Sequence, residues 1–359
     1  MIKDRHILIK NIYYMLSYAF RVLQQKEYQE LETESFEHAK DLLAAILAKA
    51  VALQLKGGLL RDYIKMTDDL AGLRGKIRLR ESIHHQIKKS KKLACEFDEY
   101  SENHLMNQIL KTTMFHLLSD KDVQDSTKQK IKRSYLYFNE VGYIEPSSIK
   151  WKTLQYHRHN ATYRMLMSIC NFILKDLLLT TEEGTQKLAG FLDDQSMARL
   201  FEKFLLEFYK KHYPQLRPEA KQIEWDVDGN THYLPSMKTD IMLRDGNKKL
   251  IIDAKYYSRM MQHHYDNYSI HSANLYQIYA YVKNEDKNQT GKISGMLLYA
   301  RTDEAVAPKS SYDMKGNIIH VRTLDLNTSF NSIKKQLDTF VTEWKSEDEG
   351  NKLQNRKIV

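Results

Sequence analysis

The sequence predicts a mixed α/β protein of two domains, and three observations support this fold class. The chain has 359 residues, which is long for one compact domain and comfortable for two. Its second half passes from helix to strands, helix, strands and helix, a succession typical of a mixed sheet with helices packed on it. Pro (5) and Gly (13) are scarce and no flexible linker is present, so the domains must meet at a tight boundary.

The change in pattern places the boundaries. Residues 1–160 are expected to form a first domain of helices and strands, residues 161–345 a second domain, and residues 346–359 a flexible polar tail.

Helical and strand-like patterns mix in the first domain. Apolar spacing predicts helices over residues 11–23 and 39–55, and the second ends at Gly57-Gly58. Residues 73–83 alternate as a strand does, with Ile77 and Leu79 on one face. The basic run 88–92 indicates a solvated loop or edge, or a contact with a nucleic-acid backbone. Further helices are predicted over 102–118 and 126–138, the latter carrying Lys128, Lys130, Lys132 and Arg133.

The second domain begins with a predicted helix over residues 161–179. Ser196 is the expected N-cap of the next helix, because an apolar stripe at helical spacing follows it: Met197, Leu200, Phe201, Phe204, Leu205, Phe208 and Tyr209. Strands are predicted near 221–227, 239–244, 249–257, 293–300 and 317–325, with a helix over 273–283 and a last helix that includes Trp344.

Composition narrows the class of protein. Apolar residues make up 42% and charged residues 28%, as in an ordinary globular protein, and no run of 18 apolar residues predicts a membrane span. The N-terminus has no secretory signal, and the two cysteines, Cys95 and Cys170, form no CxxC pair. We therefore expect a cytoplasmic protein without a cysteine-based zinc site. The net charge of +9 modestly favours a polyanionic partner.

The stretch with the clearest chemistry is residues 237–257. Two strand-like runs flank Asp245-Gly246-Asn247, which predicts a tight hairpin. If the turn is centred on Gly246-Asn247, Asp240 lies directly opposite Asp253, and Lys255 points to the same face because it follows Asp253 by two residues. A slip of one residue would place the two carboxylates on opposite faces.

Two facing carboxylates destabilise a sheet by a few tenths to about 1 kcal/mol, so their pairing favours a role as ligands. Asp240 and Asp253 offer the hard oxygen atoms that Mg²⁺ binds, with Mn²⁺ as an alternative. Lys255 fits a place beside an attacking water, where its charge would offset the charge that develops on phosphorus. The alternative interpretation is an ordinary surface hairpin, since Asp-x-Lys is common by chance.

Two neighbouring helices supply further candidates. Gln277 and Tyr281 share a helix face at i and i+4 and could contact nucleic acid beside the metal site. Glu202 and Glu207 flank the apolar stripe of the upstream helix, and periodicity alone does not choose which one reaches the metal. The alternative for both glutamates is a solvated boundary position.

These motifs occur in a familiar order. FEKFLLEF (201–208), MKTD (237–240), IIDAKYY (251–257) and QIYAY (277–281) together resemble the RecB-like branch of the PD-(D/E)XK nuclease superfamily. NIYYMLSYAF (11–20) and FDEYSENHLMNQILK (97–111) extend the resemblance to the McrC family, the nuclease subunits of modification-dependent McrBC restriction systems. The resemblance covers residues 11–344, nearly the whole chain. One departure is Thr239, which stands where the superfamily pattern has Pro.

The resemblance implies a fold and a division of labour. The second domain would be restriction-endonuclease-like, with Asp240, Asp253, Lys255 and Glu202 as its catalytic residues, of which Asp240, Asp253 and Glu202 would also be its metal ligands. Glu202 matches the family's helical acid better than Glu207 does. The substrate would be double-stranded DNA of a 5-methylcytosine-dependent system. The first domain would dock onto a hexameric McrB-like AAA+ GTPase and stimulate its hydrolysis of GTP.

The sequence agrees with a need for such a partner. It contains no GxxxxGK[ST] phosphate loop, so we expect no nucleotide to bind to this chain. The strand-like segment 73–83 is the candidate partner contact through Arg74, Lys76, Arg78 and Arg80, with a solvated strand face as the alternative. Two other functions stay open: an adaptor that activates an AAA+ enzyme with nuclease chemistry secondary, and a standalone RecB-like DNA nuclease.

Overall fold

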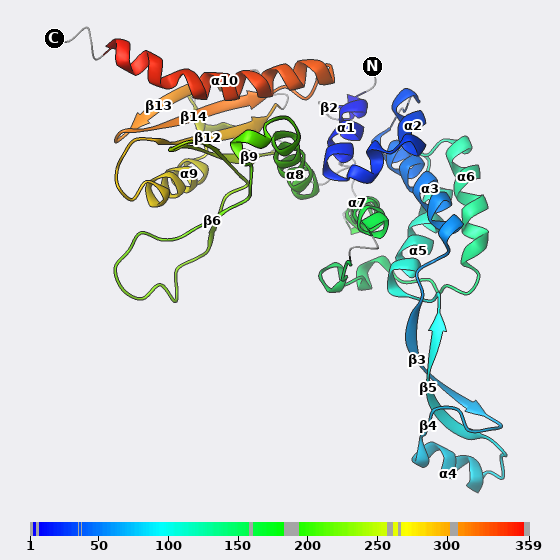
Figure 1. Ribbon diagram of the computed structural model, residues 1–359. Helices are drawn as coiled ribbons and strands as arrows, with labels where there is room; N and C mark the ends of the chain where they lie inside the picture. Colours follow the sequence, from blue (N-terminus) through cyan, green and yellow to red (C-terminus); the bar gives the residue numbers. More distant parts are fainter. Residues whose placement is uncertain are drawn as a thin grey trace. The chain divides into compact units, whose positions relative to one another are not determined.

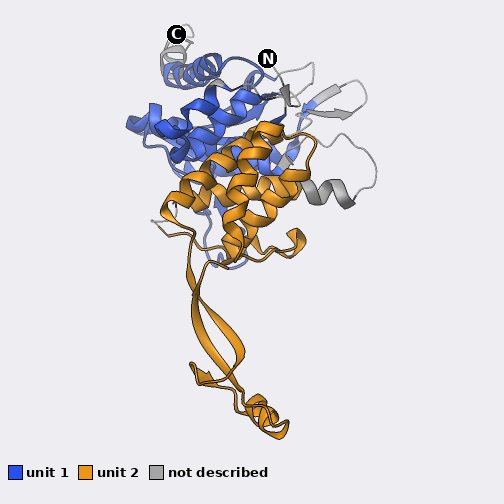
Figure 2. Cartoon of the chain, turned by 90° about the vertical axis from the view of Figure 1, so that its right-hand side faces the viewer, with its two compact units in different colours: residues 1–39, 188–359 blue, residues 40–187 orange. Residues whose placement is uncertain are grey.

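The chain divides into two compact units. The computed structural model describes residues 3–4, 7–34, 36, 38–157, 161–182, 194–256, 261–264, 267–301 and 308–354. Residues 1–39 and 188–359 form unit 1, and residues 40–187 form unit 2 (Figure 2). In the described part of the chain, no helix is both long and apolar enough to cross a membrane.

Unit 1 is built on a mixed sheet, as predicted. Among the described residues it has five strands in the order β13 (Ser310–Met314), β14 (Asn317–Leu324), β12 (Ile293–Ala300), β9 (Lys248–Lys255) and β8 (Ile241–Asp245). The three central strands run parallel, and β13 and β8 pair antiparallel at the two edges. Every residue of β12 is buried, as expected of a central strand covered on both faces.

Helices cover this sheet. Figure 1 shows α10 (Phe330–Gln354) and α9 (Ser272–Glu285) on opposite sides of it, while α8 (Asp194–His212) packs on β8 and β9. The predicted apolar stripe of α8 is buried along its whole length. At Gly295 of β12, a Cβ atom would lie 2.8 Å from Ile278 Cγ1 of α9 and 2.8 Å from Ile319 Cδ1. The missing side chain therefore lets α9 approach the sheet closely.

The observed units divide the chain differently from the predicted boundary at residue 160. The N-terminal helix α1 (Ile9–Ala19) belongs to unit 1, because Tyr18 packs edge-on against Phe204 of α8 at 5.5 Å and also contacts Phe208. Helix α7 (Ala161–Glu182) belongs to unit 2, where it packs on α5 (Leu105–Ser119). Helical periodicity marks an apolar face but does not identify the helix that covers it.

Short elements complete unit 1. They are β1 (Lys3–Asp4), β2 (Ile7–Leu8), α2 (Gln29–Thr33), β6 (Gln222–Ile223), β7 (Met237–Lys238), β10 (Met261–His264), β11 (Asn267–Ile270) and 3-10 helices at Arg21–Gln24, Lys26–Tyr28 and Pro214–Leu216. The strand predicted near 221–227 is thus reduced to two residues, and β10, β11 and β13 lie outside the predicted strands.

Unit 2 combines a helical bundle with a long arm. The bundle consists of α3 (Ala39–Gly57), α5, α6 (Asp125–Tyr135) and α7, followed or joined by 3-10 helices at Leu136–Phe138, Pro146–Ser148 and Trp151–Thr153. As predicted, α3 ends at a glycine pair, and Gly58 has φ +87°, a conformation that favours glycine. The arm is the antiparallel pair β3 (Asp62–Leu70) and β5 (Leu93–Ser101), which projects from the bundle and carries β4 (Lys76–Ile77) and α4 (Leu79–Ile87) at its far end (Figure 1).

A buried polar cluster fixes the root of the arm to the bundle. The side-chain amide of Asn107 on α5 donates to the carbonyl oxygen of Leu60 at 2.8 Å and to that of Glu102 at 2.7 Å, one at each end of the arm. Tyr163 of α7 donates its hydroxyl to Asn107 Oδ1 at 2.6 Å and accepts from Leu60 N at 2.9 Å. Both chains of the arm are therefore held where they leave the bundle.

The strand predicted over residues 73–83 is wrong beyond Ile77. Only Lys76–Ile77 pair as a strand, and Leu79 begins the helix α4. Leu79, Ile83 and Ile87 recur at i, i+4 and i+8, a helical period that outweighs the short alternation before them. Of the candidate partner contacts, Arg74 lies in the loop before β4, Lys76 in β4, Arg78 at the N-cap of α4 and Arg80 within α4.

Two smaller expectations also need correction. Ser196 is not the N-cap of α8, because it lies inside the helix. The polar residues Asp194 and Gln195, which precede it, are already helical. The predicted tail from residue 346 is helical as far as Gln354, because a helix satisfies its own backbone hydrogen bonds without apolar partners. Residues 355–359 lie outside the described residues.

Candidate functional site

The β8–β9 hairpin has the predicted register. Its pairs run from Ile241 opposite Ile252 to Asp245 opposite Lys248, around a turn at Gly246-Asn247. Gly246 has φ +58°, as a tight hairpin turn requires. Continuing the register by one residue places Asp240 opposite Asp253.

The apolar residues around these carboxylates explain their position. Ile251 and Ile252 are fully buried within β9, so the register is fixed by burial as well as by the turn. Asp253 is buried with 2% of its surface exposed, and Asp240 directly precedes β8. Asp240 Oδ2 accepts a hydrogen bond of 2.8 Å from the backbone N–H of Ala254 on the neighbouring strand. The two acids therefore meet at the end of the hairpin opposite its turn.

Lys255 joins the acids as predicted. Its Nζ lies 2.8 Å from Asp253 Oδ2, and the Lys255 side chain is 15% exposed. Lys255 also donates to Gln277 Oε1 of α9 at 3.1 Å, and Gln277 Nε2 donates to the hydroxyl of Tyr281 at 2.9 Å. The two α9 residues proposed to contact DNA thus form a chain that ends on the ammonium group.

Of the two glutamates, Glu202 is the one whose pKa is influenced by the charges of Asp240, Asp253 and Lys255. Burial, together with the charge of Asp240, raises the pKa of Glu202 to about 7, and Lys255 opposes the shift. Glu207 instead forms ion pairs with Lys210 at 2.8 Å and Arg21 at 3.4 Å. The two glutamates lie on different sides of α8 and therefore have different surroundings. The periodicity of the apolar stripe alone does not distinguish between them.

The pKa values of both aspartates are also raised. Burial raises the pKa of Asp253 to about 6; Lys255 opposes the shift and the charge of Asp240 adds to it. Burial likewise raises the pKa of Asp240, opposed by the hydrogen bond from Ala254 and by nearby lysines. Three acids with raised pKa values mark a place where negative charge is costly and where a cation would be favourable.

The donor atoms suit a hard divalent cation. Asp253 Oδ2 is buried and lies 2.8 Å from the ammonium nitrogen of Lys255. Two aspartate carboxylates are the number that Mg²⁺ commonly takes from protein, with water or phosphate completing its shell. Glu202 does not close the set: within the described ranges, no three His, Cys, Asp or Glu side chains form a group that could hold a metal ion.

The four candidate partner contacts belong to the arm of unit 2. All four are exposed. The guanidinium of Arg74 lies 3.9 Å from the centre of the Phe97 ring, and Arg78 pairs with Glu81 of α4. Lys76 and Arg80 have no ion pair with any described residue.

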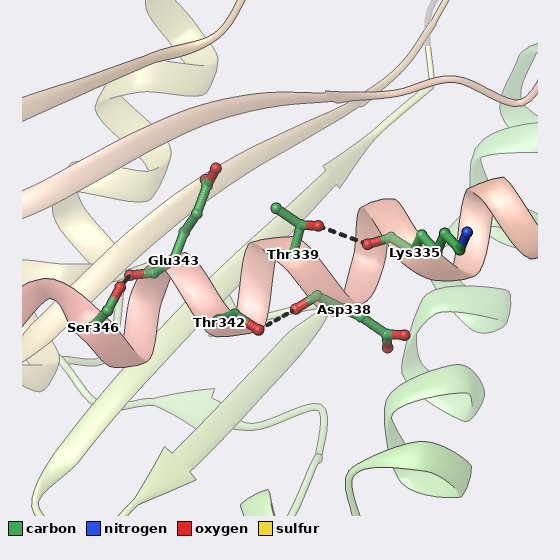
Figure 3. A pocket seen from close by; sticks show the side chains of 6 residues that line it. All are labelled: Lys335, Asp338, Thr339, Thr342, Glu343 and Ser346. Carbon is green, nitrogen blue, oxygen red and sulfur yellow. Dashed lines mark hydrogen bonds between the residues drawn. The ribbon is translucent and has the colours of Figure 1, made fainter.

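The sequence pattern did not reveal one surface depression, which lies along α10. It has a volume of about 480 Å³ and is lined by one helix only, through Lys335, Asp338, Thr339, Thr342, Glu343 and Ser346 (Figure 3). Each hydroxyl drawn there donates to a carbonyl oxygen of its own helix, as Thr342 does to Asp338 at 2.9 Å. None of the candidate site residues lines it.

Comparison with known proteins identifies the family to which the chain belongs. The family model described as "McrBC 5-methylcytosine restriction system component" matches residues 3–300. The chain belongs to this McrBC family. The resemblance inferred from the motifs is thereby confirmed.

Relatives of this family cover most of the chain. The Type IV methyl-directed restriction enzyme EcoKMcrBC of Escherichia coli K12 is 28% identical over 336 residues, which span 92% of this chain and 96% of that protein. A half-complex of Thermococcus gammatolerans McrB AAA+ hexamers with bound McrC contains a chain with a TM-score of 0.48 and 16% identity, covering 93% of this chain and 75% of that one. A second T. gammatolerans McrBC complex gives a TM-score of 0.41 and 17% identity, over 57% and 58%.

Proposed function

We propose that the chain is the DNA endonuclease subunit of a 5-methylcytosine-dependent restriction complex. One observation carries the proposal: Asp240, Asp253 and Lys255 converge at the end of a buried hairpin, with Glu202 beside them. Membership of the McrBC family supplies the context in which two acids and a lysine on adjacent strands suggest phosphodiester hydrolysis.

The cofactor we propose is Mg²⁺, with Mn²⁺ as a substitute. Asp240 and Asp253 would hold it, with Glu202 approaching from α8 once its carboxyl is deprotonated. Bound there, the ion would polarise the scissile phosphate and lower the pKa of a coordinated water.

Lys255 is the residue that we assign to the attacking water. Its ammonium group is mostly buried and already held by two partners, Asp253 and Gln277, so its direction is fixed before substrate binds. A preorganised positive charge in such a site stabilises the charge that develops on the phosphate oxygens. Gln277, aimed by Tyr281, keeps the ammonium from collapsing entirely onto Asp253.

The proposed partner is a hexameric AAA+ GTPase of the McrB type, which this chain would stimulate. The arm is the proposed contact. Its tip exposes an apolar stripe on α4, with Leu79, Ile83 and Ile87 exposed by 70%, 54% and 73%, next to the cations Lys76 and Arg80. A helix with an uncovered apolar face gains by packing against another protein.

A second function has its own support. The chain could act mainly as an activator of the AAA+ enzyme, because the arm of unit 2 ends in an exposed apolar stripe on α4. The convergence of the acids favours the nuclease as the principal role, with activation as a companion role.

The test uses the whole chain with its AAA+ partner, GTP and a duplex that contains 5-methylcytosine. We expect cleavage with Mg²⁺ or Mn²⁺, none in excess EDTA, and recovery when Mg²⁺ is restored. EDTA would also stop GTP hydrolysis by the partner, which needs Mg²⁺. A nicking assay with the chain and Mn²⁺ but no GTP is therefore the control that tests the metal requirement of the nuclease site by itself. Cleavage that persists in EDTA contradicts the proposal.

A further inference from the structure

Helix α6 in unit 2 presents a basic outer face that neither the nuclease site nor the arm uses. Its inner face packs into the bundle, since Thr127, Ile131 and Ser134 are buried and Phe138 continues the same buried row. These positions are spaced three and four apart, so the opposite side of the helix faces solvent.

Two rows of side chains run along that outer side. One row is Lys128, Lys132 and Leu136, and the other is Gln129, Arg133 and Tyr137, each spaced by four residues. Lys132 and Arg133 are exposed, Lys128 is half-buried, and Leu136 and Tyr137 at the end of the rows are 64% and 68% exposed. In each row the cationic or polar side chains come first, and an exposed apolar side chain follows at the C-terminal end.

Within the described part of the chain, no acidic side chain pairs with the cations on this face. Lys128, Lys132 and Arg133 form no ion pair or side-chain hydrogen bond with any described residue. Asp125 in the first turn is the one acid within α6. Lys40 of the same unit, by contrast, pairs with Asp120 at 3.0 Å. The face therefore carries an uncompensated positive charge.

We propose that the outer face of α6 binds the phosphate backbone of double-stranded DNA. The inference rests on the proposed function in one respect, namely that DNA is the substrate. Lys128 and Lys132 are one helical step of four residues apart, about 6 Å along the axis, which is close to two base-pair steps of about 3.4 Å. Cations at this spacing can each meet a phosphate, and Tyr137 and Leu136 can pack on the sugars between them.

The charge pattern favours DNA over an acidic protein surface. A protein contact of this size usually has an apolar centre and few charges. On α6 the order is reversed: the cations occupy the middle of the face and the apolar groups lie at one end. Contacts of this kind position the duplex without reading its sequence.

The experiment compares two triple variants of the full chain. Lys128→Gln/Lys132→Gln/Arg133→Gln removes the face, and Lys56→Gln/Lys150→Gln/Lys152→Gln removes three exposed cations elsewhere in unit 2. Binding of a fluorescent 30-base-pair duplex is measured by anisotropy in EDTA over a series of salt concentrations. Far-UV circular dichroism and melting curves check the fold; if the α6 triple variant melts early, Lys132→Gln/Arg133→Gln replaces it.

We expect the α6 variant to bind DNA about tenfold or more weakly at about 0.1 M salt, and its plot of log K against log salt to flatten by up to about 2.7, which is three phosphate contacts at about 0.9 each. The control variant should keep the wild-type slope. Equal slopes and affinities for the two variants overturn the proposal. So does normal DNA binding by the α6 variant together with lost binding to the AAA+ partner, which would make the face a protein contact.

The result can be separated from a failure of the nuclease proposal. Asp253→Ala should lose cleavage but keep the wild-type affinity and salt slope. If Asp253→Ala still cuts DNA, the site assignment fails while the α6 measurement stands. If it is inactive and the α6 variant binds as the control does, only the α6 inference fails.

Discussion

Two antiparallel hairpins in this molecule, β8–β9 and the arm, differ in how they are stabilised. In the β8–β9 hairpin, β9 lies inside a five-stranded sheet and five of its eight residues are buried. In the arm, β3 has no buried residue, and among the described strands those of the arm pair with each other and with the short β4. The first hairpin is held by the core of its unit, whereas the second is held by backbone hydrogen bonds and by its root at Asn107.

The contrast explains what each hairpin can do. Burial around Asp253 fixes its position, which a site for metal-assisted chemistry requires. The same burial raises its pKa. The arm gives up burial and gains reach, and it ends in an apolar stripe on α4 that no described residue covers. One hairpin is complete within the chain, and the other is suited to a surface that the chain lacks.

The largest expected effect is on cleavage. Asp253→Ala or Lys255→Ala should reduce DNA cleavage by roughly a thousandfold or more, since a single preorganised charged group carries several kcal/mol of transition-state stabilisation. Cleavage is measured on a methylated duplex with the partner and GTP, and stimulation of GTP hydrolysis should be unchanged.

Glu207→Ala is the matched control on α8, because its ion pairs with Lys210 and Arg21 lie away from the acids. We expect it to retain cleavage within about twofold. Near-normal cleavage by Asp253→Ala, or a severe loss in Glu207→Ala, would place the chemistry elsewhere and remove one side of the comparison.

The same contrast explains what could be predicted from the sequence. The β8–β9 register followed from the turn at Gly246-Asn247 and from the buried Ile251 and Ile252, which leave one pairing open. On the arm, few residues are buried, so the order of apolar and polar residues is not constrained by a core. The short alternation at Ile77 and Leu79 therefore predicts a strand where the structure has a helix. Exposed segments lack the signal that sequence analysis depends on.

Tertiary partners were the other limit. Helix spacing identified α1 and α7, but not that Tyr18 packs on α8 or that Tyr163 holds Asn107. Likewise, the choice between Glu202 and Glu207 depended on the side of α8 that faces β9. Such information lies in the packing of distant segments, and a single sequence does not contain a direct record of it.

The second effect tests the arm. Replacing residues 71–92 with Asn-Gly should leave Leu70 and Leu93, the last pair of β3 and β5, joined by a two-residue turn. This removes β4 and α4 but leaves the root and the bundle. We expect stimulation of the partner's GTP hydrolysis to fall at least tenfold, as measured by phosphate release.

This design is sharper than deletion of the first 160 residues, which would also remove α1 from unit 1. A milder variant, Leu79→Ser/Ile83→Ser/Ile87→Ser, keeps the arm and removes only its apolar stripe. If both variants stimulate the partner as the wild type does, the arm is not the contact.

The third effect concerns pH and the metal-free chain. Because burial raises the pKa of Asp253 to about 6, the folded state binds more protons than the unfolded state between about pH 4 and 6. Stability should therefore fall as pH rises through this window, by on the order of 3 kcal/mol from Asp253. Glu202, with a pKa of about 7, extends the decline upward.

Asp253→Asn cannot ionise at this position, so in EDTA its melting temperature should decline less than that of the wild type as pH rises from 4 to 7. Adding Mg²⁺ at pH 7 should raise the melting temperature of the wild type more than that of the variant. Parallel pH profiles for the two proteins would show that ionisation of Asp253 is not what lowers the stability of the folded chain.

The smallest effect separates two roles for α9. Tyr281 is 7% exposed, and its hydroxyl accepts a hydrogen bond from Gln277, which in turn holds Lys255. We expect Tyr281→Phe to lower kcat about three- to tenfold with little change in KM, because one hydrogen bond that aims the ammonium is worth about 1 kcal/mol. Tyr276→Phe on the same helix, at a position 70% exposed, should change neither constant. A rise in KM for Tyr281→Phe with unchanged kcat would instead make this side chain a DNA contact, as the motif alone indicates, and would move α9 from the positioning of Lys255 to the binding of substrate.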